Sequence, residues 1–120
     1  MLRTSAVLLA LPLLIAAASA TIRSGEGVKP VVMEAVSPGE ALPGAVVAVT
    51  GANLDMVRAL YLTDGNNDFA MEIVEQTGAI LRFRIPAKTP AGRMRIAIEE
   101  TITGRFLEEP VFVNVLRPVG

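Results

Sequence analysis

Two short segments alternate strictly between apolar and mostly charged residues, and this pattern restricts the fold more than any other feature of the chain. Residues 81–85 read Leu-Arg-Phe-Arg-Ile, and residues 93–98 read Arg-Met-Arg-Ile-Ala-Ile. Successive side chains of a β-strand point to opposite faces of its sheet, so a period of two predicts strands with one buried and one wet face. Both segments are therefore predicted to be strands of a half-exposed sheet.

Other short β-branched runs are separated by turn-forming residues, which is typical of a sandwich or barrel. They predict strands over residues 31–36, 45–50, 57–63, 69–75 and 111–115. No segment after residue 20 shows a helical period, so two sheets must cover each other. The sequence predicts an all-β, immunoglobulin-like sandwich of about seven strands, preceded by a cleavable signal peptide.

The first twenty residues have the pattern of an export signal. Arg3 supplies a positive charge, residues 6–18 are apolar apart from a proline, and Ala18-Ser19-Ala20 predicts cleavage between Ala20 and Thr21. Thirteen helical residues rise about 20 Å, which is short of the roughly 30 Å hydrocarbon core. We therefore expect a secreted or periplasmic protein without stable membrane insertion after cleavage. A buried N-terminal helix and an uncleaved anchor are the alternatives.

The chain is predicted to contain one domain, at residues 31–116, between a flexible leader at 21–30 and a tail at 117–120. After cleavage it would carry ten basic and twelve acidic residues, a net charge of −2. That balance argues against nucleic acid as a partner. The chain contains no Cys, so its stability must come from the apolar core.

An ordered series of short motifs resembles the IPT/TIG domains, which are immunoglobulin-like domains of the E-set type. The series covers about residues 30–115 and consists of Val36-Ser37-Pro38, Pro43-Gly44, Thr50-Gly51-Ala52-Asn53-Leu54, Leu81-x-Phe83-x-Ile85-Pro86 and Ala91-Gly92. Leu54 stands where the family usually has Phe. The resemblance implies a binding, spacer or dimerisation module, and the fold alone does not choose among these.

The residues that most enzymes use are missing or badly placed. The chain has no His and no Cys, which excludes triads based on either residue and a zinc site with the usual ligands. The pairs Glu99-Glu100 and Glu108-Glu109 are predicted at strand ends of a sandwich without a cleft. We expect no enzyme activity, no catalytic residue and no cofactor.

One polar segment has the ligand spacing of a calcium loop. Asp64, Asn66, Asp68 and Glu75 match positions 1, 3, 5 and 12 of an EF-hand. Position 6, which should be Gly, is Phe69, and the residues after it alternate like a strand. The segment is therefore interpreted as a hairpin tip without metal. A weak Ca²⁺ site of another geometry, formed by Asp64, Asn66 and Asp68, is the alternative.

The four arginines of the alternating segments are expected on solvated outer faces. In an immunoglobulin-like topology the two strands belong to opposite sheets, so the arginines cannot form one basic patch. Cross-strand Glu residues are their expected partners. The aromatic residues, Tyr61 and four Phe, are too few to predict a stacking surface.

The favoured function is a non-enzymatic exported binding or structural module that acts through protein contacts at the cell envelope. The alternative is a carbohydrate-binding or surface-associated module of a polysaccharide-handling system, which the scarcity of exposed aromatic residues disfavours. The dimerisation half of a DNA-binding protein is opposed by the export signal and the charge. The number of aromatic side chains that share one exposed face distinguishes the first two.

A partner is expected along one sheet edge. Pro30 and Pro38 bracket the first strand and Pro110 interrupts the last, whereas residues 69–75 contain no proline and only Glu72 charges their middle. Strand addition by a protein or envelope component, or by a second copy in a weak homodimer, is therefore predicted there. The residues assigned to this partner edge are Phe69, Met71, Glu72, Ile73 and Glu75.

Overall fold

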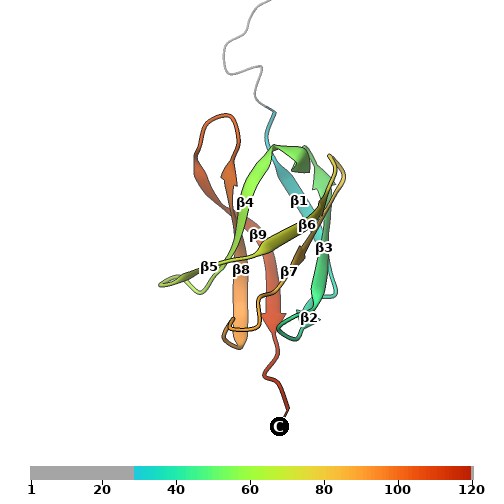
Figure 1. The fold of residues 1–120 in the computed structure, drawn as a ribbon. Helices are drawn as coiled ribbons and strands as arrows, with labels where there is room; N and C mark the ends of the chain where they lie inside the picture. Colours follow the sequence, from blue (N-terminus) through green and yellow to red (C-terminus); the bar gives the residue numbers. More distant parts are fainter. Residues whose placement is uncertain (1–28, 120) are drawn as a thin grey trace, which may run out of the picture.

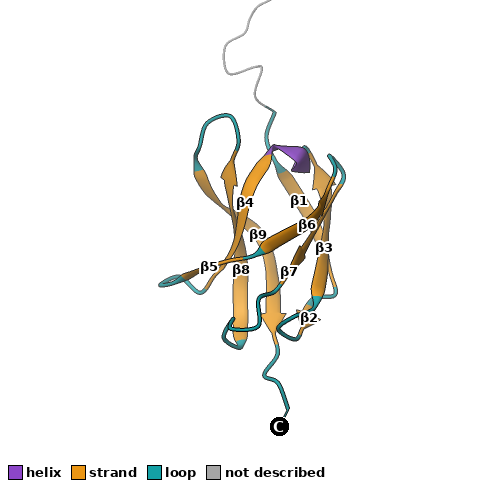
Figure 2. Ribbon diagram, viewed as in Figure 1, coloured by secondary structure: helices purple, strands orange, loops and turns teal. Residues whose placement is uncertain are grey.

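The computed structural model describes residues 29–119, so the predicted signal peptide, its cleavage site at Ala20 and Thr21, and most of the leader lie outside the described residues (Figure 1). The described part is built almost entirely from strands, with one short 3-10 turn at Leu54–Met56 (Figure 2). The strands are β1 Val32–Ser37, β2 Glu40–Ala41, β3 Val46–Ala52, β4 Val57–Thr63, β5 Asp68–Ala70, β6 Glu72–Gln76, β7 Ile80–Arg84, β8 Gly92–Glu100 and β9 Phe106–Val115. Between residues 29 and 119 no helix has the length and apolar character needed to span a membrane.

The strands form two sheets that pack face to face. One has four strands in the order β1-β3-β7-β6, and the other has five in the order β2-β9-β8-β4-β5. Neighbouring strands are antiparallel except for β2 and β9, which run parallel. The predicted all-β fold of two covering sheets is confirmed. β1 begins at one end of the sandwich and β9 ends at the other (Figure 1).

The core between the sheets is built from the inward-facing positions of the alternating segments. Phe83, Leu81 and Ile85 are fully buried, and so are Ile96 and Ile98. The register predicted from the period of two is therefore correct in both strands. β7 and β8 belong to different sheets, so the arginines between these residues point in opposite directions.

Three of the four arginines have the cross-strand glutamates that were expected. The ion pairs are Arg82 Nε–Glu75 Oε1 at 3.2 Å, Arg84 Nη1–Glu72 Oε1 at 3.3 Å and Arg95 Nη1–Glu108 Oε1 at 3.1 Å. All six side chains are substantially exposed. Each pair therefore contributes at most about 1 kcal/mol to stability.

The structure corrects the prediction of a single strand over residues 69–75. That segment is divided at Met71, with β5 in the five-stranded sheet and β6 in the four-stranded one. Phe69, Met71 and Ile73 all pack against the core between the sheets, so the alternation continues while the chain crosses over. This division, together with the two-residue β2, gives nine strands where the sequence predicts about seven.

The last strand is longer than predicted, and Pro110 lies within it. β9 begins at Phe106 and pairs Arg95 with Phe112 and Ala97 with Glu108. One residue of β8 thus faces three residues of β9, which form a bulge. A proline, which has no N–H to donate, is tolerated where the ladder is interrupted in this way.

The motif Thr50-Gly51-Ala52-Asn53-Leu54 closes the end of the sandwich at which β1 begins. Asn53 has a φ of 59°, in the left-handed region that Asn tolerates better than most residues. Its side-chain amide donates a hydrogen bond to the carbonyl oxygen of Pro30 at 2.7 Å. Leu54 is fully buried. Within the motif, Asn53 therefore allows the tight turn and binds the segment that leads into β1, and Leu54 contributes a side chain to the core.

Candidate functional site

Three of the five aromatic side chains share the outer face of the five-stranded sheet. Tyr61 alternates on β4 with Leu60 and Leu62, which are buried, so it points outward. Phe106 and Phe112 on β9 pair with Glu99 and Arg95, which point outward from β8. Although five aromatic residues are too few to predict a stacking surface, three of them therefore gather on one outer face. The sequence contains an indication of this arrangement, because Phe106 and Phe112 are an even number of residues apart and so point to the same face of one strand.

Two of these rings form a small apolar patch over β8. The centroids of Tyr61 and Phe106 are 5.5 Å apart, at an interplanar angle of 52°. β8 lies between the strands that carry them, so the rings meet across it. Ala97 of β8 points outward and stands apart from the inner core cluster, yet it is fully buried. The aromatic pair therefore covers Ala97, while Phe106 itself stays 48% exposed.

Two guanidinium groups hold the third ring. The Cζ atoms of Arg93 and Arg95 lie 4.0 and 4.8 Å from the centroid of Phe112, within cation–π range. Arg95 also pairs with Glu108, whereas Arg93 has no ion pair within residues 29–119. The planar group of Arg93 is therefore held against an aromatic surface with its donors not committed to a carboxylate.

The polar segment that resembles a calcium loop is the tip of the β4–β5 hairpin. The backbone N–H groups of Asn66 and Asn67 donate to Asp64 Oδ1 at 2.8 and 2.7 Å. These hydrogen bonds favour the ionised carboxylate and hold the pKa of Asp64 below its ordinary value. Gly65 has a φ of 96°, which permits the turn. Asp64 thus organises the backbone of the tip.

Calcium at millimolar concentration is expected to leave the melting temperature unchanged. Among the described residues, no group of three acidic side chains is arranged to hold a metal ion. A site with Ca²⁺ at 100 times its dissociation constant would add about 2.7 kcal/mol of stability. Scanning calorimetry with and without CaCl₂ measures this directly. A rise in melting temperature that Asp64→Asn abolished would establish the metal site instead.

A pocket of about 210 Å³ lies between the hairpin tip and the Arg93–Phe112–Arg95 stack. Its walls bring together backbone and side chains from β4, β8, β9 and the tip. Two guanidinium groups and two carboxylates contribute equal numbers of positive and negative charges. The lining residues are Thr63, Asp64, Gly65, Arg93, Arg95, Glu108 and Phe112.

The structure places the predicted partner edge at the rim of both sheets, with β5 at the edge of one and β6 at the edge of the other. Phe69, Met71 and Ile73 pack against the core, whereas Val74 is exposed. Glu72 and Glu75 pair with arginines of β7. A register shift between Ile73 and Glu75 marks a bulge in β6. Short strands, charges and bulges are features that protect sheet edges. Strand addition at this edge stays a prediction.

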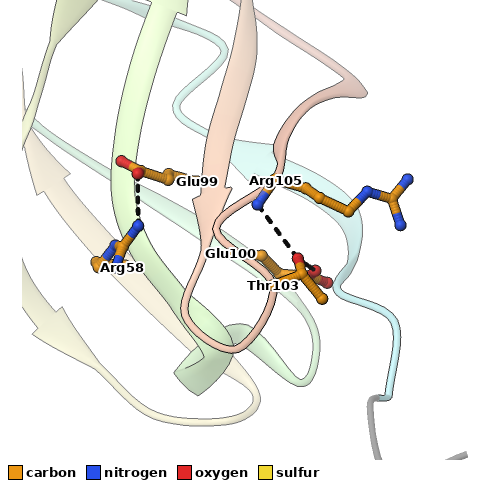
Figure 3. Close-up of polar contacts among 5 residues, drawn as sticks. All are labelled: Arg58, Glu99, Glu100, Thr103 and Arg105. Atoms are coloured by element: carbon orange, nitrogen blue, oxygen red, sulfur yellow. Dashed lines mark hydrogen bonds and ion pairs between the residues drawn. The ribbon is translucent and has the colours of Figure 1, made fainter. Parts of the chain in front are cut away.

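The four acidic residues predicted at strand ends have different surroundings. Glu99 points outward to Arg58 Nη2 at 2.6 Å, while the adjacent Glu100 points to the other side and accepts a hydrogen bond from the Thr103 hydroxyl (Figure 3). Glu100 is 4% exposed. Glu109 lies in the β9 bulge rather than at a strand end and is 7% exposed. Glu100 ends β8, as predicted, and both carboxylates are buried.

Replacing Glu109 with Gln is expected to stabilise the protein at neutral pH and to change its stability little at pH 4. Burial, together with the negative charge of Glu100, raises the pKa of Glu109 above its ordinary value of 4.5. A carboxyl whose pKa is raised by folding favours the folded state below the unfolded pKa, and this contribution is lost as pH rises through the folded pKa. Denaturant unfolding at pH 4 and pH 7.5 tests this, with exposed Glu34→Gln as control. Equal effects of Glu109→Gln at both pH values would contradict it.

The described chain is thus an all-β sandwich domain with one outer face that carries aromatic rings, stacked arginines and a pocket of balanced charge. No protein-family model matches the chain, and no curated protein matches it. The fold is shared with a structural genomics protein of unknown function from Bacteroides thetaiotaomicron. The TM-score is 0.64 at 19% identity, over 76% of this chain and 23% of that one.

Two further similar structures come from Bacteroides ovatus. One is an auxiliary nutrient binding protein, with a TM-score of 0.53 and 18% identity over 76% of this chain and 22% of that one. The other is SGBP-B of a mixed-linkage glucan utilization locus, in complex with a mixed-linkage heptasaccharide. Its TM-score is 0.51 at 25% identity, over 68% of this chain and 20% of that one. The chain therefore spans less than a quarter of the length of each of these proteins.

Proposed function

We propose that the chain is an exported, non-enzymatic binding module of a polysaccharide-handling system, built on an immunoglobulin-like domain of the IPT/TIG type. The observation that carries this proposal is the gathering of Tyr61, Phe106 and Phe112 on one exposed face. Aromatic rings bind the apolar C–H faces of sugar rings and bury large areas at low entropic cost. The gathering of aromatic rings therefore favours carbohydrate as the ligand, whereas the sequence alone favours contacts with a protein.

The similar structures support the same proposal from a separate direction. One is described as a nutrient binding protein, and another was solved with a bound heptasaccharide. The signal-like N-terminal residues support export, and the absence of His and Cys supports a module without catalysis. The IPT/TIG assignment is supported by the motif at residues 50–54, in which Gly51 allows a close approach of β1, Asn53 adopts a left-handed conformation and Leu54 enters the core.

Affinity electrophoresis of the purified protein tests the proposal. Native gels containing mixed-linkage glucan, xylan, mannan or pectin are compared with gels that contain no polysaccharide. At least one polysaccharide is expected to retard the protein without being shortened. Unchanged migration in every gel would overturn the proposed function, and a fall in polysaccharide length during incubation would overturn its non-enzymatic part.

A further inference from the structure

We propose that the pocket between the β4–β5 tip and the Arg93–Phe112–Arg95 stack binds a neutral oligosaccharide, an inference that rests on the proposed function. Three separate segments of the chain converge on this pocket: the end of β4 with the tip that follows it, the start of β8, and β9 on both sides of its bulge. Its volume of about 210 Å³ is smaller than that of sites that enclose a whole drug-sized ligand. The pocket therefore fits one sugar unit of an oligosaccharide whose other units lie along the protein surface.

The charges of the pocket select a ligand that both donates and accepts hydrogen bonds. Arginine side chains only donate, and ionised carboxylates only accept. Arg93, Arg95, Asp64 and Glu108 all line the pocket, so its net formal charge is zero. An anionic ligand would meet the two carboxylates, and a cationic one the two guanidinium groups. A neutral sugar, whose hydroxyl groups donate and accept, satisfies both kinds of partner.

The polar groups of the pocket are held in place without a ligand. Phe112 supports the guanidinium of Arg93 at 4.0 Å, so part of the rotamer entropy of Arg93 is lost before binding. Two backbone N–H groups fix Asp64 and keep it ionised. Glu108 is positioned by Arg95 at 3.1 Å. Groups that are ordered in advance cost less free energy when a ligand binds.

The ligand extends from the pocket toward the Tyr61–Phe106 pair. Arg95, beside the pocket, and Glu99, opposite Phe106, are four residues apart on β8. At about 3.3 Å per residue, about 13 Å of the outer face separates Arg95 from Glu99. Arg95 and Glu99 both point outward from the five-stranded sheet. Of the Tyr61–Phe106 pair, Phe106 is the ring that is exposed to solvent. An oligosaccharide, rather than a monosaccharide, contacts both ends of this strip.

Oligosaccharide titrations followed by calorimetry and by amide chemical shifts test the site. The probes are gluco-, xylo- and manno-hexaoses, mixed-linkage glucan heptaose and, as the acidic control, hexagalacturonate. We expect a neutral probe to bind and to shift the amides of residues 63–65, 93–95 and 112. Arg93→Gln and Phe112→Ala are each expected to weaken that binding at least about tenfold, because the first removes a charged donor and the second removes the ring that holds it.

A matched control lies on the opposite sheet, where Arg84 is similarly exposed and also belongs to an alternating strand. Arg84→Gln is expected to leave the affinity unchanged. Arg93 is exposed, so its substitution tests the site even if Phe112→Ala lowers stability. Binding that neither variant weakens, or tighter binding of hexagalacturonate than of every neutral probe, would overturn this inference and leave the proposed function standing. No binding of any probe or polysaccharide would overturn both.

Discussion

Replacing Phe83 with Ala is expected to lower the free energy of unfolding by about 3–5 kcal/mol. Phe83 is fully buried on β7, where it pairs with Val47 on one side and Ile73 on the other. It is the only aromatic side chain of the described residues that is fully buried, so the substitution removes the largest side chain of the core. The loss is a large part of the 5–15 kcal/mol that stabilises a typical domain.

The adjacent residue supplies the control for this substitution. Arg82 lies on the solvated face of the same strand and pairs with Glu75 at 3.2 Å. Arg82→Ala removes an exposed ion pair and is expected to cost at most about 1 kcal/mol. Urea unfolding followed by circular dichroism measures both variants. Losses of similar size would mean that the two faces of β7 are equally buried, against the register described above.

Gly51→Ala is expected to destabilise the protein by about 3 kcal/mol, at the upper end of the range for overpacked sites. A Cβ built on Gly51 would stand 1.9 Å from the backbone oxygen of Val32 and 2.9 Å from its carbonyl carbon. Both contacts are to backbone atoms, so no rotamer change relieves them. The alternative is a displacement of β1, which would break its pairing with β3.

A second glycine, in the turn between β1 and β2, separates this steric effect from the general effect of Gly→Ala. A Cβ at Gly39 would meet no heavy atom within 4 Å, and its φ is not in the left-handed region. Gly39→Ala is expected to change stability by no more than about 0.5 kcal/mol. Thermal unfolding of the two variants gives the comparison. A Gly51→Ala protein as stable as the Gly39→Ala protein would show that β1 adapts without cost.

The period of two was sufficient to predict the central strands because their environment is uniform along their length. β7 keeps one face toward the core and the other toward water from end to end, and β8 does so except at Ala97, whose outward side chain is covered. Residues 69–75 do the same, and for that reason their crossing between sheets at Met71 left no trace in the pattern. Period reports which side of a strand is buried, but it does not report which sheet the strand joins.

The candidate site could be predicted less well because it depends on pairing between strands. The outward direction of Tyr61 follows from its buried neighbours in sequence, but its contact with Phe106 requires that β4 and β9 flank β8. Arg93 was expected to meet a glutamate, but the register of β9 places Phe112 opposite Arg95, and Arg93 stacks on that ring instead. The bulge at Pro110 sets that register and contains the buried Glu109. Neither consequence can be derived from local composition.

The parallel pairing of β2 with β9 gives the domain a mechanical property. β1 begins at one end of the sandwich and β9 ends at the other, so tension applied at the two ends pulls β2 and β9 in opposite directions along their common axis (Figure 1). The Asn114 N–H donates to Gly39 O, and the Leu116 N–H donates to Ala41 O, both at 2.8 Å. Under such a load these bonds are sheared and must break together instead of opening one after another. Forced unfolding is governed by the rate of crossing that barrier. The short β2 strand therefore acts as a clamp that resists tension between the two ends of the domain.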